Sequence, residues 1–175
     1  MEARKFNSSP NPRTHHLFLG RILNMEVNHH GPDLSDPYKI VEIKFCLNPG
    51  RQGWTVDENQ MAYGNNGKTG YWALGRYEMT RPVAEVKTTV TATLERMVTK
   101  REIWVVPWRW MDQFQGSRCT GVGKNGRTWD HTLRYAKKAE LPDVKESVDI
   151  EKGVIHLTKG VRRDDFSYLF TGIPF

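Results

Sequence analysis

Alternation of apolar and polar positions, which is typical of half-buried β-strands, recurs along much of this chain. In YKIVEIKFCL (38–47), apolar residues at every second position from Val41 alternate with Glu42 and Lys44. The clearest case is VAEVKTTVTATLERMV (83–98), where apolar residues and threonines alternate with charged residues and threonines. Because threonine and valine favour extended backbone, this segment predicts one long antiparallel strand with a polar face.

Shorter segments predict further pieces of sheet. They are HLFLGRILNMEV (16–27), GYWALGRYEMT (70–80), REIWVVPW (101–108) and SVDIEKGVIHLT (147–158). The segment 101–108 follows 83–98 after a short turn and is a candidate to pair with it, and Pro107 ends the ladder. The segment 147–158 predicts a hairpin that turns around Glu151, Lys152 and Gly153.

One helix is predicted over residues 128–138. Thr128 can cap its N-terminus, Asp130 lies in its first turn, and two lysines lie in its last turn. Apolar residues at i, i+4 and i+7 from Trp129 share one face, and Pro142 stops the helix. The fold class expected from these elements is α+β: a mainly antiparallel β-sheet with one or two helices in a single domain.

The two ends of the chain differ in character. Residues 1–14 are polar and predict a flexible basic arm, so the globular domain is expected to span 15–175. The tail DDFSYLFTGIPF (164–175) carries more apolar side chain than a free end exposes to water. It docks either on its own core or on a neighbouring copy, and we favour the second, which implies self-association. The residues expected to carry it are Phe166, Tyr168, Phe170, Ile173 and Phe175.

Charge singles out one part of the chain. The net charge is +6, and residues 100–138 alone hold nine basic side chains against three acidic ones. The nine are Lys100, Arg101, Arg109, Arg118, Lys124, Arg127, Arg134, Lys137 and Lys138. Four of the six tryptophans lie in the same segment, and basic residues interleaved with aromatics suit a nucleic acid or an anionic membrane. The alternative is a tryptophan core with a solvated basic rim.

Two glycine-containing stretches imitate nucleotide-binding motifs. AYGNNGKT (62–69) has the outline of a P-loop, which requires a buried strand before it and a helix after it. Its flanks are polar before and strand-like after, so we expect a hairpin-type turn in which Lys68 is solvated. GVGKNG (121–126) matches the dinucleotide fingerprint, but no buried strand precedes it, which favours a mobile basic loop.

Metal and catalytic signals are weak. The histidines occur as two adjacent doublets and two isolated residues, without the spaced pairs of zinc sites. Cys119 and His131 could form a nucleophile and base only through a fold that the sequence does not predict. We therefore expect no enzymatic activity, no cofactor and no metal. Only two cysteines, Cys46 and Cys119, predict a reducing compartment rather than secretion, and a disulfide between them stays open.

One stretch resembles a known family. The succession RPVAEVKTTVTATLERMV (81–98) and VVPWRWMDQF (105–114) is similar to the C-terminal half of rhabdovirus matrix proteins, in particular those of the plant-infecting branch. Pro107, Trp110 and Phe114 stand near that family's proline–tryptophan–phenylalanine pattern. The Pro-Pro-x-Tyr motif common in the family is missing from this chain.

The resemblance implies a viral structural layer protein found in the host cytoplasm and the virion. Such a protein associates with itself, contacts the nucleoprotein or RNA, and lies against an anionic membrane. A viral RNA-binding protein, either a silencing suppressor or a capsid protein, is the main alternative. A small nucleotide-binding enzyme is a remote one that rests on the two glycine-containing stretches alone.

Overall fold

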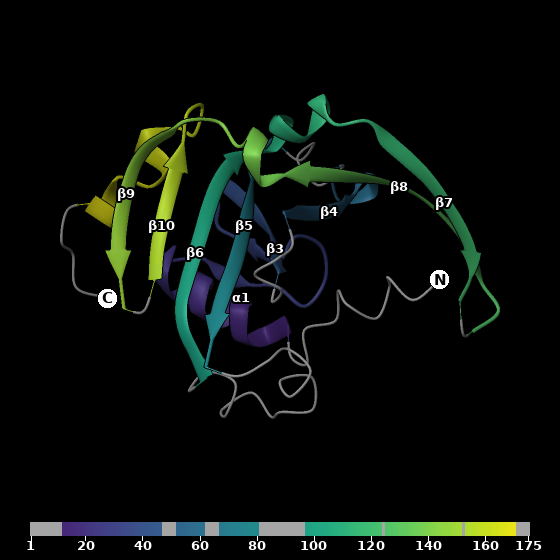
Figure 1. Cartoon of the computed structure of the whole chain (residues 1–175), viewed down its shortest axis with the longest axis horizontal. Coiled ribbons are helices and arrows are strands. Elements are labelled where there is room, and N and C mark those ends of the chain that lie inside the picture. The colour runs from purple at the N-terminus through teal and green to yellow at the C-terminus, as the bar shows by residue number, and fades with distance from the viewer. Residues whose placement is uncertain are drawn as a thin grey trace.

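The computed structural model describes residues 12–46, 52–61, 67–80, 97–123, 125–151 and 153–170. Most of them lie in β-strands, arranged as two sheets with one longer helix (Figure 1). Of the eight strand pairings described, six are antiparallel. The predicted class, α+β with mainly antiparallel sheets, is confirmed.

The main sheet has seven strands in the order β1-β2-β3-β5-β6-β10-β9. Their bounds are Glu26–Val27 (β1), Leu34–Ser35 (β2), Lys39–Cys46 (β3), Thr69–Met79 (β5), Val98–Pro107 (β6), Gly153–Thr158 (β10) and Val144–Ile150 (β9). The pairs β3–β5 and β6–β10 are parallel, and the other four pairs are antiparallel. The sheet therefore joins segments that lie far apart in the sequence.

A second sheet of three antiparallel strands has the order β4-β8-β7. Its strands are Gly53–Asp57 (β4), Thr128–Lys137 (β8) and Gly116–Val122 (β7). The short helix Glu58–Met61 (α2) follows β4, and the 3-10 helix Trp108–Gln113 (η3) leads from β6 to β7. Three further 3-10 turns are Lys138–Glu140 (η4), Arg163–Asp165 (η5) and Ser167–Phe170 (η6).

Successive residues of the central strands face two different cores. Tyr71 and Ala73 of β5 belong to one core, whereas Trp72 and Leu74 belong to the other. The first, which we call the helix-side core, is covered by α1 and the C-terminal 3-10 turns; the second, the sheet-side core, is covered by the three-stranded sheet and η3. Both faces of the main sheet are thus buried near its centre, so β3 is more buried than the predicted half-buried strand.

The N-terminal helix α1, Pro12–Ile22, replaces the predicted strand over 16–27, which is wrong except at Glu26–Val27. The segment carries a second period that the alternation concealed: Leu19, Ile22 and Leu23 recur at i, i+3 and i+4 and are all buried in the helix-side core. The first residues of α1, 12–14, belong to the segment predicted as a flexible arm. Residues 1–11 of that arm lie outside the described residues.

The predicted helix over 128–138 is also wrong, because residues 128–137 form strand β8. Trp129 and Ala136 do not share a face in the strand: Ala136 is buried in the sheet-side core, while Trp129 lies on the opposite side. Pairing with β7 on one side and β4 on the other satisfies the β8 backbone. Tertiary pairing overrides a local helical pattern here.

Several strand predictions are confirmed: 38–47 contains β3, 70–80 matches β5, and 147–158 forms the β9–β10 hairpin. Strand β6 ends at Pro107 as expected. At residues 101–105 it is paired with β5 on one side and β10 on the other, so the pairing considered with 83–98 is wrong there. Of the predicted strand 83–98, only Met97 and Val98 lie within the described residues.

The part of the tail that the structure describes docks on the chain's own core. Phe166 is fully buried, with its ring centroid 5.1 Å from that of Tyr71, and Leu169 is buried beside it. Tyr168 and Phe170 are partly buried against the same core. The predicted contribution of Phe166 to an interface between copies therefore conflicts with its position, while Ile173 and Phe175 lie outside the described residues.

Candidate anionic-surface binding hairpin

Strands β7 and β8 form a hairpin that extends away from the main sheet (Figure 1). The two strands pair from Gly116 opposite Arg134 to Val122 opposite Thr128. Strand β4 pairs only with residues 133–137 of β8, so the outer half of the hairpin is a two-stranded ribbon. Among the described residues, no third strand pairs with this outer half.

The tip of the hairpin is a tight turn. The N–H of Gly123 donates to the carbonyl of Arg127 at 2.8 Å, and the N–H of Gly126 donates to that of Gly123 at 2.9 Å. Asn125 accepts the N–H of Arg127 on its side chain, and Gly126 adopts a φ of 74°, which favours glycine. The stretch GVGKNG therefore joins two antiparallel strands, which is not the strand-to-helix setting that a dinucleotide requires.

The outer hairpin combines exposed basic and apolar side chains. Val122, the last residue of β7, is 69% exposed, and Arg118 and Arg127 are exposed as well. Arg118 forms hydrogen bonds of 3.0 and 3.1 Å from its Nε to the carboxylate of Asp130. This pair holds the pKa of Asp130 below its usual range, but both groups are in water, so it stabilises the hairpin little.

Trp129 packs on one face of the ribbon. Its ring lies against the backbone of Gly121, where a Cβ atom would come within 2.1 Å of a ring carbon. The ring is also 5.5 Å from that of His131, two residues along the same strand. Only glycine leaves room for this contact, so the pair Gly121–Trp129 holds the outer ribbon in register.

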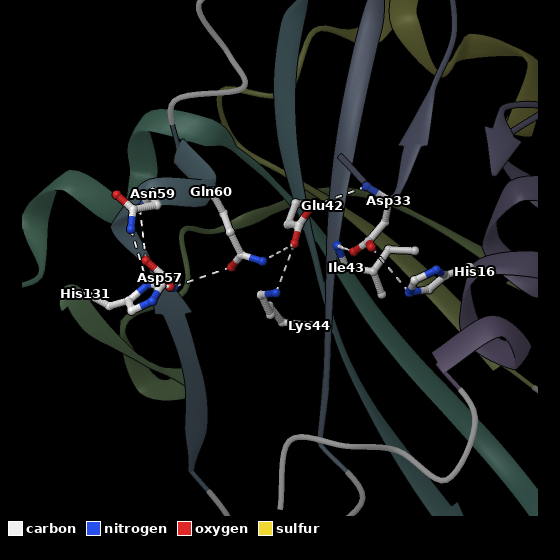
Figure 2. A network of polar contacts seen from close by, with 9 residues as sticks. All are labelled: His16, Asp33, Glu42, Ile43, Lys44, Asp57, Asn59, Gln60 and His131. Carbon is white, nitrogen blue, oxygen red and sulfur yellow. Dashed lines mark hydrogen bonds and ion pairs between the residues drawn. The ribbon is translucent and has the colours of Figure 1, made fainter. Parts of the chain in front are cut away.

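A polar network connects the hairpin to the main sheet (Figure 2). The Nδ1 of His131 contacts the carboxylate of Asp57, and the Nδ2 of Asn59 lies 3.2 Å from the same ring nitrogen. Gln60, the next residue of α2, donates its Nε2 to Glu42 Oε1 at 2.5 Å. Because Glu42 belongs to β3, the contacts connect β8 through α2 to the main sheet.

The network continues across β3 to α1 (Figure 2). Glu42, only 2% exposed, accepts hydrogen bonds from Lys44 Nζ at 3.0 Å and from the N–H of Asp33 at 3.3 Å. The Asp33 carboxylate accepts the N–H of Ile43 at 2.8 Å and lies 3.5 Å from His16 Nε2. Burial raises the pKa of Glu42, which Lys44 partly offsets, and burial lowers the pKa of His16.

The nine basic residues predicted to bind an anionic partner spread over β6, η3 and the β7–β8 region. The exposed ones are Lys100, Arg109, Arg118, Arg127 and Lys137. Lys124 lies in the tip of the hairpin by sequence but outside the described residues. Of these exposed residues, Arg118 lies in the outer part of β7 and Arg127 in the tip of the hairpin.

Three of the nine are buried or half-buried and contact other parts of the fold. Arg101 is only 3% exposed, and its guanidinium lies 4.1 Å from the ring centroid of Phe18, so it is not a surface residue as predicted. Arg134 donates to the Phe114 carbonyl and lies 3.3 Å from Glu58. Lys138 places its Nζ 4.9 Å above the ring centroid of Trp104 and 4.0 Å from Glu102.

The tryptophans of 100–138 mostly belong to the interior. Trp104 and Trp108 are buried in the sheet-side core, and Trp108 stacks on Trp72 with ring centroids 4.4 Å apart. Trp110 packs against that core and against Phe114. For these three residues the alternative interpretation, a tryptophan core, is confirmed, and only Trp129 stands on the hairpin.

Lys68 does not occupy a P-loop. Helix α2 precedes its loop and strand β5 begins at Thr69, which reverses the strand–loop–helix order that phosphate binding needs. Its Nζ donates to the Asp36 carbonyl at 2.7 Å, so it is half-buried rather than solvated as predicted. The groove beside α1 that it lines also contains Arg21 and Glu26, a mixture of charges.

Two nucleophile–histidine arrangements emerge from strand register. Cys119 stands directly opposite His131 on the hairpin, although its thiol donates to the Ser117 carbonyl at 3.7 Å. Both cysteines of the chain are free thiols. No group of three or more metal-ligating side chains is present among the described residues.

The other arrangement was missed by sequence reasoning. The Ser147 hydroxyl lies 2.8 Å from His156 Nδ1, and His156 Nε2 lies 3.3 Å from Glu102. These side chains come from three adjacent strands, and the His156 ring packs on Trp104. Separations of 9 and 54 residues carry no motif that could have revealed them.

Comparison with protein-family models, curated proteins and solved structures finds no match to this chain. None of the described helices is long and apolar enough to cross a membrane.

Proposed function

We propose that this chain is a non-enzymatic, matrix-type structural protein that binds an anionic surface through the β7–β8 hairpin and associates with itself. The supporting observation is a projecting ribbon whose outer half carries exposed Arg118 and Arg127 next to exposed Val122. The resemblance to rhabdovirus matrix proteins adds nucleoprotein or RNA as a further partner and the host cytoplasm and virion as its location.

An anionic membrane is the partner that the hairpin suits best. Basic side chains near an anionic leaflet contribute about 1 kcal/mol each, and apolar side chains add affinity when they enter the interface. In the headgroup region the inward-facing backbone groups of the hairpin pair across its two strands, and the outward-facing groups stay hydrated. Val122 at the end of β7 is the side chain placed to do so.

RNA binding is the second candidate, and Trp129 is the observation that favours it. It is partly exposed on the hairpin and could stack on a base beside Arg127. The buried positions of Trp104 and Trp108 weaken this candidate, because bases cannot reach their rings. The partner test therefore compares lipid with RNA directly.

The test removes the positive charges of the hairpin. The variant Arg118→Gln/Lys124→Gln/Arg127→Gln should bind phosphatidylserine-containing vesicles about 100-fold more weakly than wild type in co-flotation, if each charge contributes about 1 kcal/mol. The matched control, Lys159→Gln/Arg162→Gln/Arg163→Gln, removes three exposed charges outside the hairpin and should bind nearly as wild type.

The salt dependence and the second ligand complete the test. Wild-type binding should weaken as salt rises, and the hairpin variant should show a flatter dependence. Tighter binding to single-stranded RNA than to vesicles, lost in the same variant, would make RNA the partner. Equal vesicle binding by wild type and both variants would refute the hairpin as the binding surface.

A further inference from the structure

Strand β9 forms one outer edge of the main sheet (Figure 1). It pairs with β10 on its inner side, and among the described residues no strand pairs with its outer side. An open edge strand presents a row of backbone donors and acceptors that another strand can pair with. Within this edge, Val144 is 45% exposed, and Lys145, Ser147 and Asp149 are exposed as well.

The sequence of β9, VKESVDI, is complementary to itself in the antiparallel direction. If two copies pair with Ser147 opposite Ser147, Lys145 of each copy stands opposite Asp149 of the other. Within the regular part of the strand, the same register places Glu146 opposite Val148. Opposite charges that face each other across strands are stabilising, and two-fold symmetry makes the Lys145–Asp149 pair occur twice.

The other open edges lack this property. At the far end of the main sheet, β1 and β2 have two residues each, and the Asp33 carboxylate already accepts the N–H of Ile43 beyond them. In the second sheet, β7 has no acidic residue to face Arg118, which is engaged by Asp130. β4, the other edge strand of the second sheet, has one acidic residue and no basic one. Among the described edge strands β1, β4, β7 and β9, only β9 has basic and acidic side chains that can face each other in a second copy.

One irregularity limits the pairing. The β9–β10 register shifts between Leu157 and Thr158, so Lys145 is an extra residue on β9. Bulges bend an edge strand, and the regular edge therefore runs from Glu146 to Ile150. The long Lys145 side chain can still reach Asp149 of a second copy, because that contact does not depend on ladder hydrogen bonds.

We propose that two copies of this chain pair antiparallel along β9, centred on Ser147, to form one continuous sheet. The proposal specifies the self-association surface of the proposed function and rests on it. A two-fold axis normal to the sheet keeps both three-stranded sheets on the same side. In Figure 1 the hairpin lies at the opposite end from β9, so the dimer would present two hairpins to one surface.

Charge reversal tests the pairing by sedimentation velocity. Lys145→Glu and Asp149→Lys each turn two attractive pairs into repulsive ones, so each should weaken dimerisation at least about tenfold. The double variant Lys145→Glu/Asp149→Lys restores both pairs in reverse and should dimerise nearly as wild type. A monomeric wild type, or a double variant as weak as the singles, would overturn the proposal.

Cross-linking tests the register. In a Cys119→Ser background, Ser147→Cys should give a disulfide-linked dimer on a non-reducing gel because the residue faces its own copy. Asp149→Cys in the same background faces Lys145 instead and should remain monomeric on the gel; the reverse result would refute the register.

Vesicle binding separates this inference from the proposed function. Single β9 variants should keep the hairpin's salt-dependent binding as monomers, with affinity reduced only by the loss of bivalency. Intact dimerisation without vesicle or RNA binding would leave the β9 pairing standing and refute the proposed function.

Discussion

Replacing Phe166 by alanine tests whether the tail stabilises its own chain. The ring is fully buried, stands edge-on to Tyr71 at a centroid distance of 5.1 Å, and lies 5.6 Å from Lys39 Nζ. Truncating a fully buried phenylalanine costs about 3–5 kcal/mol of unfolding free energy, because it removes apolar burial and leaves a cavity. At about 2–4 °C per kcal/mol for a chain of this size, the melting temperature should fall by roughly 10 °C.

Urea unfolding monitored by tryptophan fluorescence measures the loss, and sedimentation velocity measures the oligomeric state. Ser167→Ala is the matched control, because its exposed side chain should cost less than about 0.5 kcal/mol. Tyr168→Phe removes the hydroxyl that donates to the Leu23 carbonyl and should cost about 1 kcal/mol. A loss below about 1 kcal/mol for Phe166→Ala, together with lost assembly, would show that the tail docks on a neighbour.

Two further predictions concern buried and half-buried charges. Burial raises the pKa of Glu42, so the folded state holds its proton more tightly, and unfolding free energy should fall as pH rises from the ordinary glutamate pKa through the raised value. In Glu42→Gln that component should vanish from urea unfolding measured across acidic pH; an unchanged pH dependence would contradict it. Lys68→Ala should cost about 1 kcal/mol by removing the hydrogen bond to the Asp36 carbonyl. Calorimetry with ATP should show no binding to either the wild type or the variant. If the wild type binds ATP and the variant does not, the P-loop interpretation would be supported instead.

The sequence alone determined the elements whose local pattern agrees with their final environment. The alternation in 38–47, the strand pattern of 70–80 and the turn residues within 147–158 each predict a strand or hairpin that the structure contains. Pro107 ends β6 because proline cannot donate to the ladder. These features depend only on residues that are close together in the sequence, so they can be predicted without knowing the tertiary structure.

Tertiary structure decided the rest, because burial and pairing involve segments far apart in the chain. Residues 128–137 carry a helical spacing, yet β4 and β7 flank them and impose a strand. The sequence predicted Arg101 to lie on a basic surface. In the structure its side chain is buried, and its guanidinium lies over the Phe18 ring. The contact of Ser147 with His156 likewise exists only because β9 and β10 pair in one register. Local periodicity indicates whether a segment favours a strand or a helix. Which of its faces is buried depends on the distant segments that pack against it, and those are decided by the tertiary structure.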